Sequence, residues 1–288
     1  MHNCLIIAGE KSGEEHTLSF LPQLRQLCPQ THFWGVGGEE LKSCGMELIY
    51  HLKDFSNMGF SGVIGKIPFY LKAMRTLVEE VEKRQCRVAI LVDCQDFNLR
   101  MAQRLSDKGV KVLYFVAPQA WAWRAGRAKK LAKYVHTLFT ILPFEKKWFS
   151  DRGVKNTIAV PHPLITRYRQ ILEEKDAKLS AKTPHGGPGS TINILLLPGS
   201  RDFEVELLLP RFWQSIQELK KEYPAPENIK VSLVKASALS ESFWSKYSYA
   251  FDQYYPDTEL AKALEDSHVA LASSGTVTLA CALFQVPT

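Results

Sequence analysis

Short apolar runs alternate with amphipathic stretches along most of this chain, and this alternation limits its fold more than any other feature. The apolar runs of the first half predict strands at 3–8, 31–36, 87–93, 111–116 and 136–142. Stretches with apolar residues at helical spacing lie between them and predict helices at 18–28, 68–83 and 99–108. Strands that alternate with helices form a parallel sheet covered by helices, so we expect an α/β fold.

A segment rich in Gly, Pro and Ser interrupts this pattern. The stretch KTPHGGPGS ends at residue 190, and its composition disfavours regular structure. We therefore expect two domains, over residues 1–180 and 191–288. In the second domain the pattern restarts, with strands at 193–197, 230–235 and 268–272 and helices at 204–221, 257–264 and after the SSGT turn. We expect this second α/β domain to be incomplete, because a final Val-Pro pair could introduce another strand.

The net charge is mildly positive, at +6 with a pI near 8.9. Such a charge suits an anionic small substrate or an anionic membrane surface as well as nucleic acid. The bases are scattered, and the chain has no zinc-finger, helix-turn-helix or RNA-binding signature. We expect no nucleic-acid partner.

The cysteines and the amino terminus bear on the compartment. The six cysteines are widely spaced, without a C-x-x-C pair, which favours reduced thiols in a cytoplasm. The first residues lack the basic and apolar regions of a signal peptide. No apolar run reaches the roughly 18 residues of a membrane span, so we expect none.

The turn after the first expected strand reads AGEKSGEEH. Gly9, Ser12 and Gly13 permit close backbone approach of a ligand at a helix N-terminus, although a tight structural turn explains the same residues. Glu10 favours a function, because an acid at the carboxyl end of a strand in an open parallel sheet lies where ligands bind.

A second acid lies at the end of the apolar run RVAILVD. Asp93 ends this run, and a carboxylate placed there can act as general base toward a substrate hydroxyl. We assign that role to Asp93 and expect Asp96 and Asn98 to cap the next helix.

Tryptophans and bases follow the fourth expected strand. Trp121 and Trp123 flank one alanine. They could be core residues, or they could line a pocket for a sugar or an acyl chain. The bases after them, which could attract an anionic group, are Arg124, Arg127, Lys129, Lys130 and Lys133.

Two turns of the second domain suit phosphate groups. Gly199, Ser200 and Arg201 follow a strand, and an arginine there can bind diphosphate through forked hydrogen bonds. The second turn, before another helix, consists of Ser273, Ser274, Gly275 and Thr276. Together the turns indicate a nucleotide diphosphate.

Other polar residues are expected to be structural. Glu204 and Glu206 lie in the first turn of a helix, where acids favour the helix dipole. His162, in VPHPL, is expected to pack within its loop. The histidines show no metal-ligand spacing, so we expect chemistry without a metal or other cofactor.

These motifs resemble those of lipid-A-disaccharide synthases. The matching segments are AGEKSG, SNMGF, DCQDFN, APQAWAWRAGR, LPFE, HPL, LLPGSRDFEVELLLP and SSGTVTL, in the order typical of that family. They cover nearly the whole chain. The WAWR block and PGSRxxEVExLLP are the most specific of them.

The resemblance implies two Rossmann-like domains facing a cleft, the GT-B glycosyltransferase architecture. It implies inverting transfer from UDP-2,3-diacylglucosamine, held by the C-terminal domain, to 2,3-diacylglucosamine 1-phosphate (lipid X), with release of UDP. It also implies catalytic roles for Asp93 and Glu10 and a diphosphate contact for Arg201. The expected donor-site residues are Arg201, Gly199, Ser200, Ser274, Gly275 and Thr276, and the expected acceptor-site residues are Ser12, Trp121, Trp123 and Arg124.

Two positions depart from the family pattern. Ala280 stands where the family usually has a glutamate after SGTxTL, and Gly62 replaces a glutamate that usually follows the MGF turn. Related transferases use the first of these glutamates to contact ribose. At position 280 this chain lacks the carboxylate for that contact.

The acylated substrates imply contact with a membrane. We expect a cytoplasmic enzyme, peripheral to the inner membrane of a Gram-negative-type bacterium, and a homodimer is possible. The candidate surface combines Ile64, Ile67, Phe69, Tyr70 and Leu71 with Lys66, Lys72 and Arg75. An ordinary amphipathic helix that packs inward explains the same pattern.

Two further functions fit the sequence. A related enzyme, such as an epimerase or another UDP-sugar transferase, would have the same architecture, because fold does not fix function. A protein that binds sugar nucleotides or lipids without catalysis is the third possibility. Ala280 favours it slightly, whereas Asp93 and Arg201 oppose it.

Overall fold

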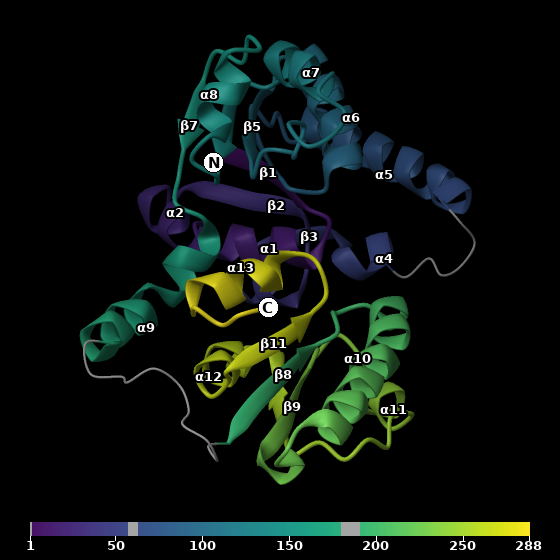
Figure 1. The fold of residues 1–288 in the computed structure, drawn as a ribbon. Helices are drawn as coiled ribbons and strands as arrows, with labels where there is room; N and C mark the ends of the chain where they lie inside the picture. Colours follow the sequence, from purple (N-terminus) through teal and green to yellow (C-terminus); the bar gives the residue numbers. More distant parts are fainter. Residues whose placement is uncertain (1, 57–62, 180–190) are drawn as a thin grey trace. The chain divides into compact units, whose positions relative to one another are not determined.

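The chain divides into two compact units, Met1–Arg167 and Tyr168–Thr288, each with its own parallel sheet (Figure 1). The computed structural model describes residues 2–56, 63–179 and 191–288. The division falls inside helix α9 (Pro163–Leu179), ahead of the expected linker. Tyr168 belongs to the second unit, where its ring packs edge-on against Phe284 at 5.3 Å.

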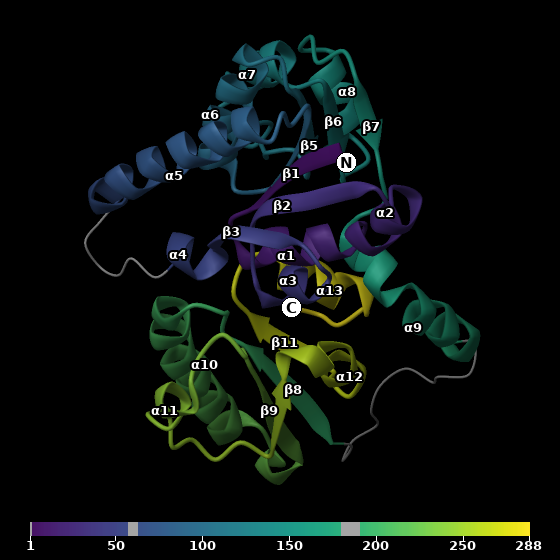
Figure 2. The same ribbon diagram turned by 180° about the vertical axis from the view of Figure 1, so that it is seen from behind.

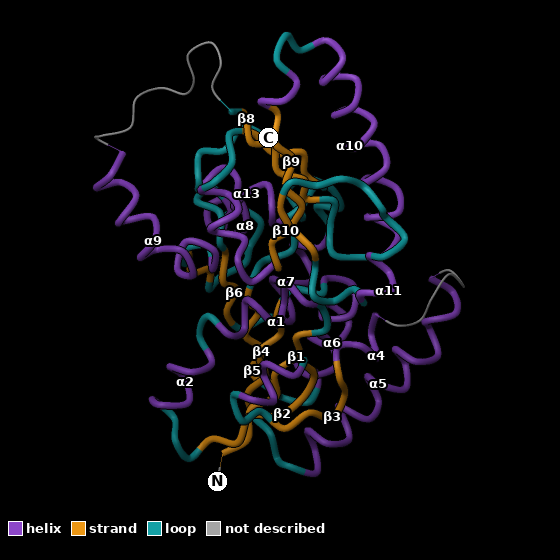
Figure 3. The backbone as a smooth tube through the Cα atoms, turned by 90° about the horizontal axis from the view of Figure 1, so that it is seen from below, coloured by secondary structure: helices purple, strands orange, loops and turns teal. Residues whose placement is uncertain are grey.

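The sheet of the first unit is parallel throughout, with the described strands in the order β3-β2-β1-β4-β5-β6-β7. Figure 3 shows β1 to β5 gathered with helices around them. The strands are β1 (His2–Ala8), β2 (Thr31–Gly37), β3 (Glu47–His51), β4 (Val88–Val92), β5 (Lys111–Phe115), β6 (Thr137–Thr140) and β7 (Thr157–Ala159).

Helices cover both faces of this sheet (Figures 1 and 2). Alternate residues of β1 point to opposite faces, so Leu5 and Ile7 enter one buried cluster while Ile6 and Ala8 enter another. Packed on the Leu5 side are α4 (Leu52–Ser56), α5 (Val63–Lys83), α6 (Gln95–Asp107), α7 (Arg127–Tyr134) and α8 (Glu145–Ser150). On the Ile6 side are α1 (Lys11–Leu18), α2 (Leu21–Leu27) and α3 (Glu39–Ser43).

The second unit has a smaller parallel sheet, in the order β10-β9-β8-β11. Its strands are β8 (Ile192–Leu197), β9 (Ile229–Lys235), β10 (Gln253–Pro256) and β11 (Val269–Ala272). After the end of α9, its α-helices are α10 (Asp202–Glu222), α11 (Glu241–Trp244), α12 (Leu260–Glu265) and α13 (Thr276–Leu283). Short 3₁₀ turns occupy Pro226–Asn228 and Asp257–Glu259. Figure 1 shows α10 and α12 on opposite sides of the sheet.

The predicted α/β fold with two Rossmann-like domains is confirmed. Every strand predicted from an apolar run is present within a few residues of its expected bounds. Three short strands were missed, β3, β7 and β10, because each lies at a sheet edge and has few buried residues. The predicted helix over 257–264 is instead a 3₁₀ turn followed by α12.

Within the described part of the chain, no helix is both long and apolar enough to cross a bilayer. The longest helices, α5 and α10, each contain a proline and many charged residues. Their apolar side chains are partly used in packing: Phe69 and Tyr70 of α5 lie against the first core.

Candidate active site

The order of strands in the first sheet reverses between β1 and β4. From β1 the chain continues to β2 on one side, whereas β4 lies on the other side and continues to β5. The helices that follow β1 and β4, α1 and α6, therefore pack on opposite faces of the sheet, and open α/β sheets bind ligands at such a reversal of strand order. The AGEKSG turn follows β1, and Asp93 follows β4.

The two loops meet in a direct contact between side chains. Ser12 Oγ donates a hydrogen bond of 2.8 Å to Asp93 Oδ2. Asp93 has a left-handed backbone, with φ of 50°, and so does Cys94, with φ of 45°. Such a conformation is strained for a residue with a side chain and persists where surrounding contacts hold it. The sequence prediction thus located two residues that the fold brings together.

Several contacts hold the backbone of Asp93. Its N–H donates to Phe115 O at 3.1 Å, and its carbonyl accepts from Tyr114 Oη at 2.9 Å and from Asn98 Nδ2 at 2.8 Å. Burial foremost, and then the nearby Asp93 charge, raise the pKa of Tyr114 well above its usual value. The Tyr114 hydroxyl therefore stays protonated and remains a donor to Asp93.

The expectation that Asp96 and Asn98 cap α6 is wrong. The N-cap residue is Cys94, and it makes no side-chain capping bond. Asn98 is fully buried, and its Nδ2 donates to carbonyl oxygens at the end of β4 instead. Asp96 Oδ1 accepts from Arg127 Nη2 at 2.6 Å and lies 3.7 Å from Arg124 Nη1. A capping motif read from local sequence does not reveal partners that come from β4 and α7.

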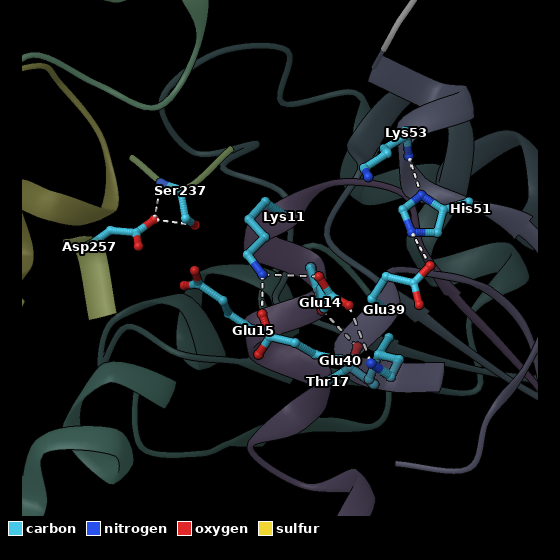
Figure 4. A network of polar contacts seen from close by, with 12 residues as sticks. Lys11, Glu14, Glu15, Thr17, Glu39, Glu40, His51, Lys53, Ser237 and Asp257 are labelled. Atoms are coloured by element: carbon cyan, nitrogen blue, oxygen red, sulfur yellow. Dashed lines mark hydrogen bonds and ion pairs between the residues drawn. The ribbon is translucent and has the colours of Figure 1, made fainter. Parts of the chain in front are cut away.

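Helix α1 is anchored on the side away from Asp93. The buried carboxylate of Glu14 accepts from Leu41 N at 3.3 Å and from Lys11 Nζ at 3.1 Å, and Lys11 also bonds Glu40 (Figure 4). A Cβ at Gly38 would lie 2.4 Å from Glu14 Oε1, so the glycine makes room for this carboxylate. This anchor fixes the turn that carries Ser12.

Glu10 lies at the same end of the sheet. It is exposed, occupies the N-cap position of α1 with extended backbone, and its carbonyl accepts from Glu14 N. Burial first, and then the charge of Glu10, raise the pKa of the Cys94 thiol. The preceding residue, Gly9, packs on Cys94, since a Cβ there would lie 3.1 Å from Cys94 Sγ. The candidate site therefore contains two carboxylates, Glu10 and Asp93.

The two tryptophans have different environments. Trp121 is half-buried: its Nε1 donates to Glu145 Oε1 at 2.9 Å, and its ring packs edge-on against Phe144 at 5.0 Å. Trp123 is 52% exposed, and the guanidinium groups of Arg124 and Arg127 lie 4.7 and 5.0 Å from its ring centroid. Trp123 is thus not a core residue, whereas Arg127, one of the bases expected to attract an anionic group, is buried.

The second sheet has its own reversal of strand order, between β8 and β11. Gly199, in the loop after β8, has φ of 115°, and a Cβ there would lie 2.4 Å from Glu204 Oε2. The same carboxylate accepts from Ser200 N at 3.2 Å, while its other oxygen accepts from Arg201 Nη1 at 2.9 Å. Glu204 therefore has the predicted structural role: it shapes the turn and positions the arginine.

The SSGT turn lies beside that loop. Ser273 N donates to Leu197 O at 2.8 Å, which joins the end of β11 to the end of β8. Gly275 is the N-cap residue of α13, with φ of 144°, and both Ser274 and Thr276 are exposed. The two predicted phosphate turns are thus adjacent. Ala280, one turn into α13, is buried at 1% exposure.

The sequence analysis missed a pair of histidines in the first unit. His16, on α1, is buried and its ring centroid lies 6.0 Å from that of His162. His162 is buried as expected, and its Nδ1 accepts from Leu164 N. The spacing of four residues between Ser12 and His16 was the available signal, because such residues share one helix face. The SNMGF turn and Gly62 lie outside the described residues.

A family model described as lipid-A-disaccharide synthetase matches residues 4–288. The chain belongs to this family. A lipid-A-disaccharide synthase of Anaeromyxobacter sp. (strain K) is 35% identical over 98% of this chain and 72% of its own length. The one of Geobacter sulfurreducens is 31% identical over 99% of this chain and 73% of its own length. Membership in this family makes the chain a glycosyltransferase of lipid A biosynthesis. The resemblance predicted from the sequence motifs is therefore confirmed.

Solved structures share the fold at low identity. A UDP-N-acetylglucosamine 2-epimerase from Rickettsia bellii superposes with a TM-score of 0.61 at 14% identity, over 100% of this chain and 78% of the other. The spinosyn rhamnosyltransferase gives 0.54 at 10% identity, over 100% and 79%. These likenesses establish the fold alone. Epimerases and transferases share this fold, so the fold does not tell them apart. The family match assigns this chain to the lipid-A-disaccharide synthetases.

Proposed function

We propose that the chain transfers a diacylglucosamine from its UDP conjugate to 2,3-diacylglucosamine 1-phosphate, with inversion at the anomeric carbon and release of UDP. The observation that carries this proposal is the Ser12–Asp93 contact at the β1–β4 reversal, in a member of the lipid-A-disaccharide synthetase family. An inverting transfer needs one base for the attacking hydroxyl, and Asp93 supplies a carboxylate at the carboxyl edge of the sheet.

Asp93 acts as general base in this proposal. Its backbone is fixed by Tyr114 and Asn98, so its carboxylate is oriented before substrate arrives. Ser12 donates to one carboxylate oxygen, which leaves the other to accept the proton of the acceptor hydroxyl. Glu10 provides a second carboxylate that orients the acceptor sugar through its hydroxyl groups.

The second unit binds the UDP part of the donor. Arg201 stabilises the negative charge that develops on the leaving diphosphate, a role that suits a planar guanidinium. The backbone amides after Gly199 and Ser200 lie at the same sheet edge as the N-terminus of α13, where Ser274, Gly275 and Thr276 gather. Glu204 has to share Arg201 with the diphosphate, because the two residues are already paired.

The acceptor contacts come from the tryptophan block. Trp121, Trp123 and Arg124 lie on the segment between β5 and α7, at the carboxyl edge of the first sheet. The exposed indole of Trp123 offers an apolar face for sugar or acyl groups, and Arg124 offers a cation for the acceptor phosphate.

Peripheral membrane contact completes the proposal. On α5, Ile67 and Leu71 expose 47% and 45% of their surface, and Lys72 and Arg75 are exposed beside them. Apolar residues flanked by cations favour the interface of an anionic membrane. Ile64 and Lys66, which belong to the same predicted surface, lie outside the side chains that the structure describes.

One assay tests the proposed reaction. Purified protein is incubated with UDP-2,3-diacylglucosamine and 2,3-diacylglucosamine 1-phosphate, and products are identified by mass spectrometry. We expect UDP and a tetraacylated disaccharide phosphate in equal amounts. Release of UDP without disaccharide, or isomerisation of the donor without the acceptor, would contradict the transfer and favour another UDP-sugar enzyme.

A further inference from the structure

Arg127 is a buried arginine at the first position of α7. Its guanidinium donates through Nη1 to Gln95 Oε1, and through Nη2 to Asp96 Oδ1 at 2.6 Å. Gln95 and Asp96 open α6, two and three residues after Asp93. Arg127 therefore joins the start of α7 to the start of the helix that follows the proposed general base. The two helices lie side by side (Figures 1 and 2).

The same guanidinium contacts the indole of Trp123. Its central carbon lies 5.0 Å from the ring centroid, and the central carbon of the Arg124 guanidinium lies 4.7 Å from it. Arg124 Nη1 is also 3.7 Å from Asp96 Oδ1, the oxygen that accepts from Arg127. One carboxylate oxygen thus faces two guanidinium groups, and both of these groups contact one indole. We refer to the side chains of Asp96, Trp123, Arg124 and Arg127 as the tryptophan clamp.

The two arginines of the tryptophan clamp differ in exposure. The side chain of Arg127 is 7% exposed, whereas that of Arg124 is 60% exposed. Arg124 also has a left-handed backbone, with φ of 58°, which is strained for a residue with a side chain and persists where surrounding contacts hold it. Arg127 is therefore held inside the protein by its hydrogen bonds, while the guanidinium of Arg124 is accessible to a ligand.

Stability alone does not account for an arginine at position 127. Removing charges from water costs free energy that a buried ion pair only partly returns, and apolar residues often replace such pairs without loss of stability. An apolar side chain would bind neither Gln95 nor Asp96, and it would lack the attraction of a cation for the face of an indole. The arginine therefore adds direction, because it fixes where Trp123 lies relative to α6.

We propose that Arg127 is a positioning residue that holds the Trp123 indole in place as the platform for the acceptor sugar. This inference rests on the proposed function, in which Trp123 contacts the acceptor. The indole is 52% exposed, so it presents accessible surface to a ligand. Ordering a side chain during binding lowers affinity, so an indole that is fixed beforehand binds the acceptor more tightly. Arg127 acts through Trp123 and needs no contact with the sugar.

The test compares Arg127→Lys with wild type in the disaccharide assay. Lysine keeps the charge, so the general attraction of the acceptor phosphate stays, but it lacks the planar fork that binds two partners at once. We expect the acceptor KM to rise about three- to ten-fold, the usual effect of ordering one side chain on binding. The donor KM should stay within about two-fold and kcat within about three-fold, because Tyr114 and Asn98 still hold the backbone of Asp93. Loss of folded protein alone would lower kcat and leave both KM values unchanged.

A double-mutant cycle tests whether Arg127 acts through the indole. Trp123→Ala should raise the acceptor KM by at least as much as Arg127→Lys. Adding Arg127→Lys to Trp123→Ala should cause no further rise, because the side chain that Arg127 positions is then absent. Two effects that simply multiply would show that Arg127 acts independently of the indole, and this result would overturn the inference.

The matched control is Arg152→Lys. The guanidinium carbon of Arg152 lies 3.9 Å from the ring centroid of Trp148, so the same pair of side-chain types is present. Arg152 precedes β7, however, and so lies at the edge of the sheet opposite to Asp93. Both KM values and kcat should remain as in wild type.

An unchanged acceptor KM in Arg127→Lys would overturn the inference, and so would an equal rise in the donor KM. If this variant gives no folded protein, Gln95→Leu decides, since it removes one hydrogen-bond acceptor of the same guanidinium without a change of charge. An unchanged acceptor KM in Gln95→Leu would then overturn the inference. Wild type that makes no disaccharide would instead overturn the proposed function, so the two failures are distinguishable.

Discussion

Ser12 Oγ and Asp93 Oδ2 lie 2.8 Å apart although the residues are separated by 81 positions in the sequence. The contact exists because β1 and β4 are neighbours in the sheet, paired from Cys4 with Val88 to Ala8 with Val92. The loops after these strands therefore begin at the same edge. Since Asp93 also has strained backbone held by two donors, its carboxylate position is set by the fold before a ligand binds.

Asp93→Asn should lower kcat by about two to four orders of magnitude, the usual contribution of a general base. The amide has the shape of the carboxylate and can still accept from Ser12, so we expect nearly unchanged folding and UDP binding. Steady-state kinetics and UDP calorimetry measure the two effects. Turnover equal to wild type would remove Asp93 from the mechanism.

Arg201→Ala should weaken UDP binding and slow transfer by roughly 2–4 kcal/mol in transition-state stabilisation, by analogy with other preorganised charge-stabilising groups. Its pairing with Glu204 reduces the effect on UDP affinity, because the cation is already partly neutralised before UDP binds. Calorimetry with UDP and kinetics with both substrates check this. Lys221→Ala, which removes a cation at the far end of α10, is the control and should leave both unchanged. Normal affinity and normal kinetics in Arg201→Ala would leave the arginine a structural residue only.

Gly199→Ala should destabilise the second unit by about 2–4 kcal/mol. The substitution adds both the cost of a positive φ and a clash with Glu204 Oε2. Gly275→Ala is the matched control in the same unit, because Gly275 also has positive φ but open space at its Cβ. It should cost about 1–3 kcal/mol. Urea unfolding measures both, and equal losses would show that the contact with Glu204 adds nothing.

Glu47→Gln should destabilise the first unit at neutral pH but not in strong acid. Hydrogen bonds from Arg84 foremost, and then from His32, lower the pKa of Glu47 from 4.5 to about 2. Because the folded-state pKa is below the ordinary value, this stabilisation is complete above about pH 4.5 and is lost as the pH falls toward 2.

Thermal melts at several pH values check this dependence. The difference in Tm between wild type and Glu47→Gln should shrink steadily from pH 6 to pH 3. The effect at neutral pH should be modest, because Glu47 is partly exposed and solvent screens the pair. Glu218→Gln, which disrupts an exposed pair with Lys221, should show little difference at any pH. A constant difference for Glu47→Gln would exclude its charge as the cause.

The triple change Lys66→Glu, Lys72→Glu, Arg75→Glu should weaken binding to anionic vesicles. Each base near such a surface contributes about 1 kcal/mol at low ionic strength, and salt should weaken wild-type binding for the same reason. Vesicle co-sedimentation measures this, with neutral vesicles as the control. Equal binding by wild type and triple variant at low salt would exclude α5 as the membrane surface.

The sequence by itself determined the fold class and which polar residues follow the central strands. Apolar runs located the central strands, because a buried strand of a parallel sheet needs apolar residues on both faces. The edge strand β3 was missed, since its residues are only half-buried and lack that pattern. Residues that follow central strands, such as Asp93 and Arg201, were predictable, because strand ends in parallel sheets face the ligand-binding edge.

Only the tertiary structure decided which side chains meet. Local sequence indicated that Asn98 caps a helix, whereas its amide binds carbonyl groups at the end of β4. It grouped Arg127 with the bases that could attract an anionic group, whereas its guanidinium is buried and contacts Asp96 and the ring of Trp123. Such partners come from other elements of the sheet and are distant in sequence. Hydrophobic periodicity records whether a position is buried, but it carries no information about which polar group lies opposite, and that depends on strand order and packing.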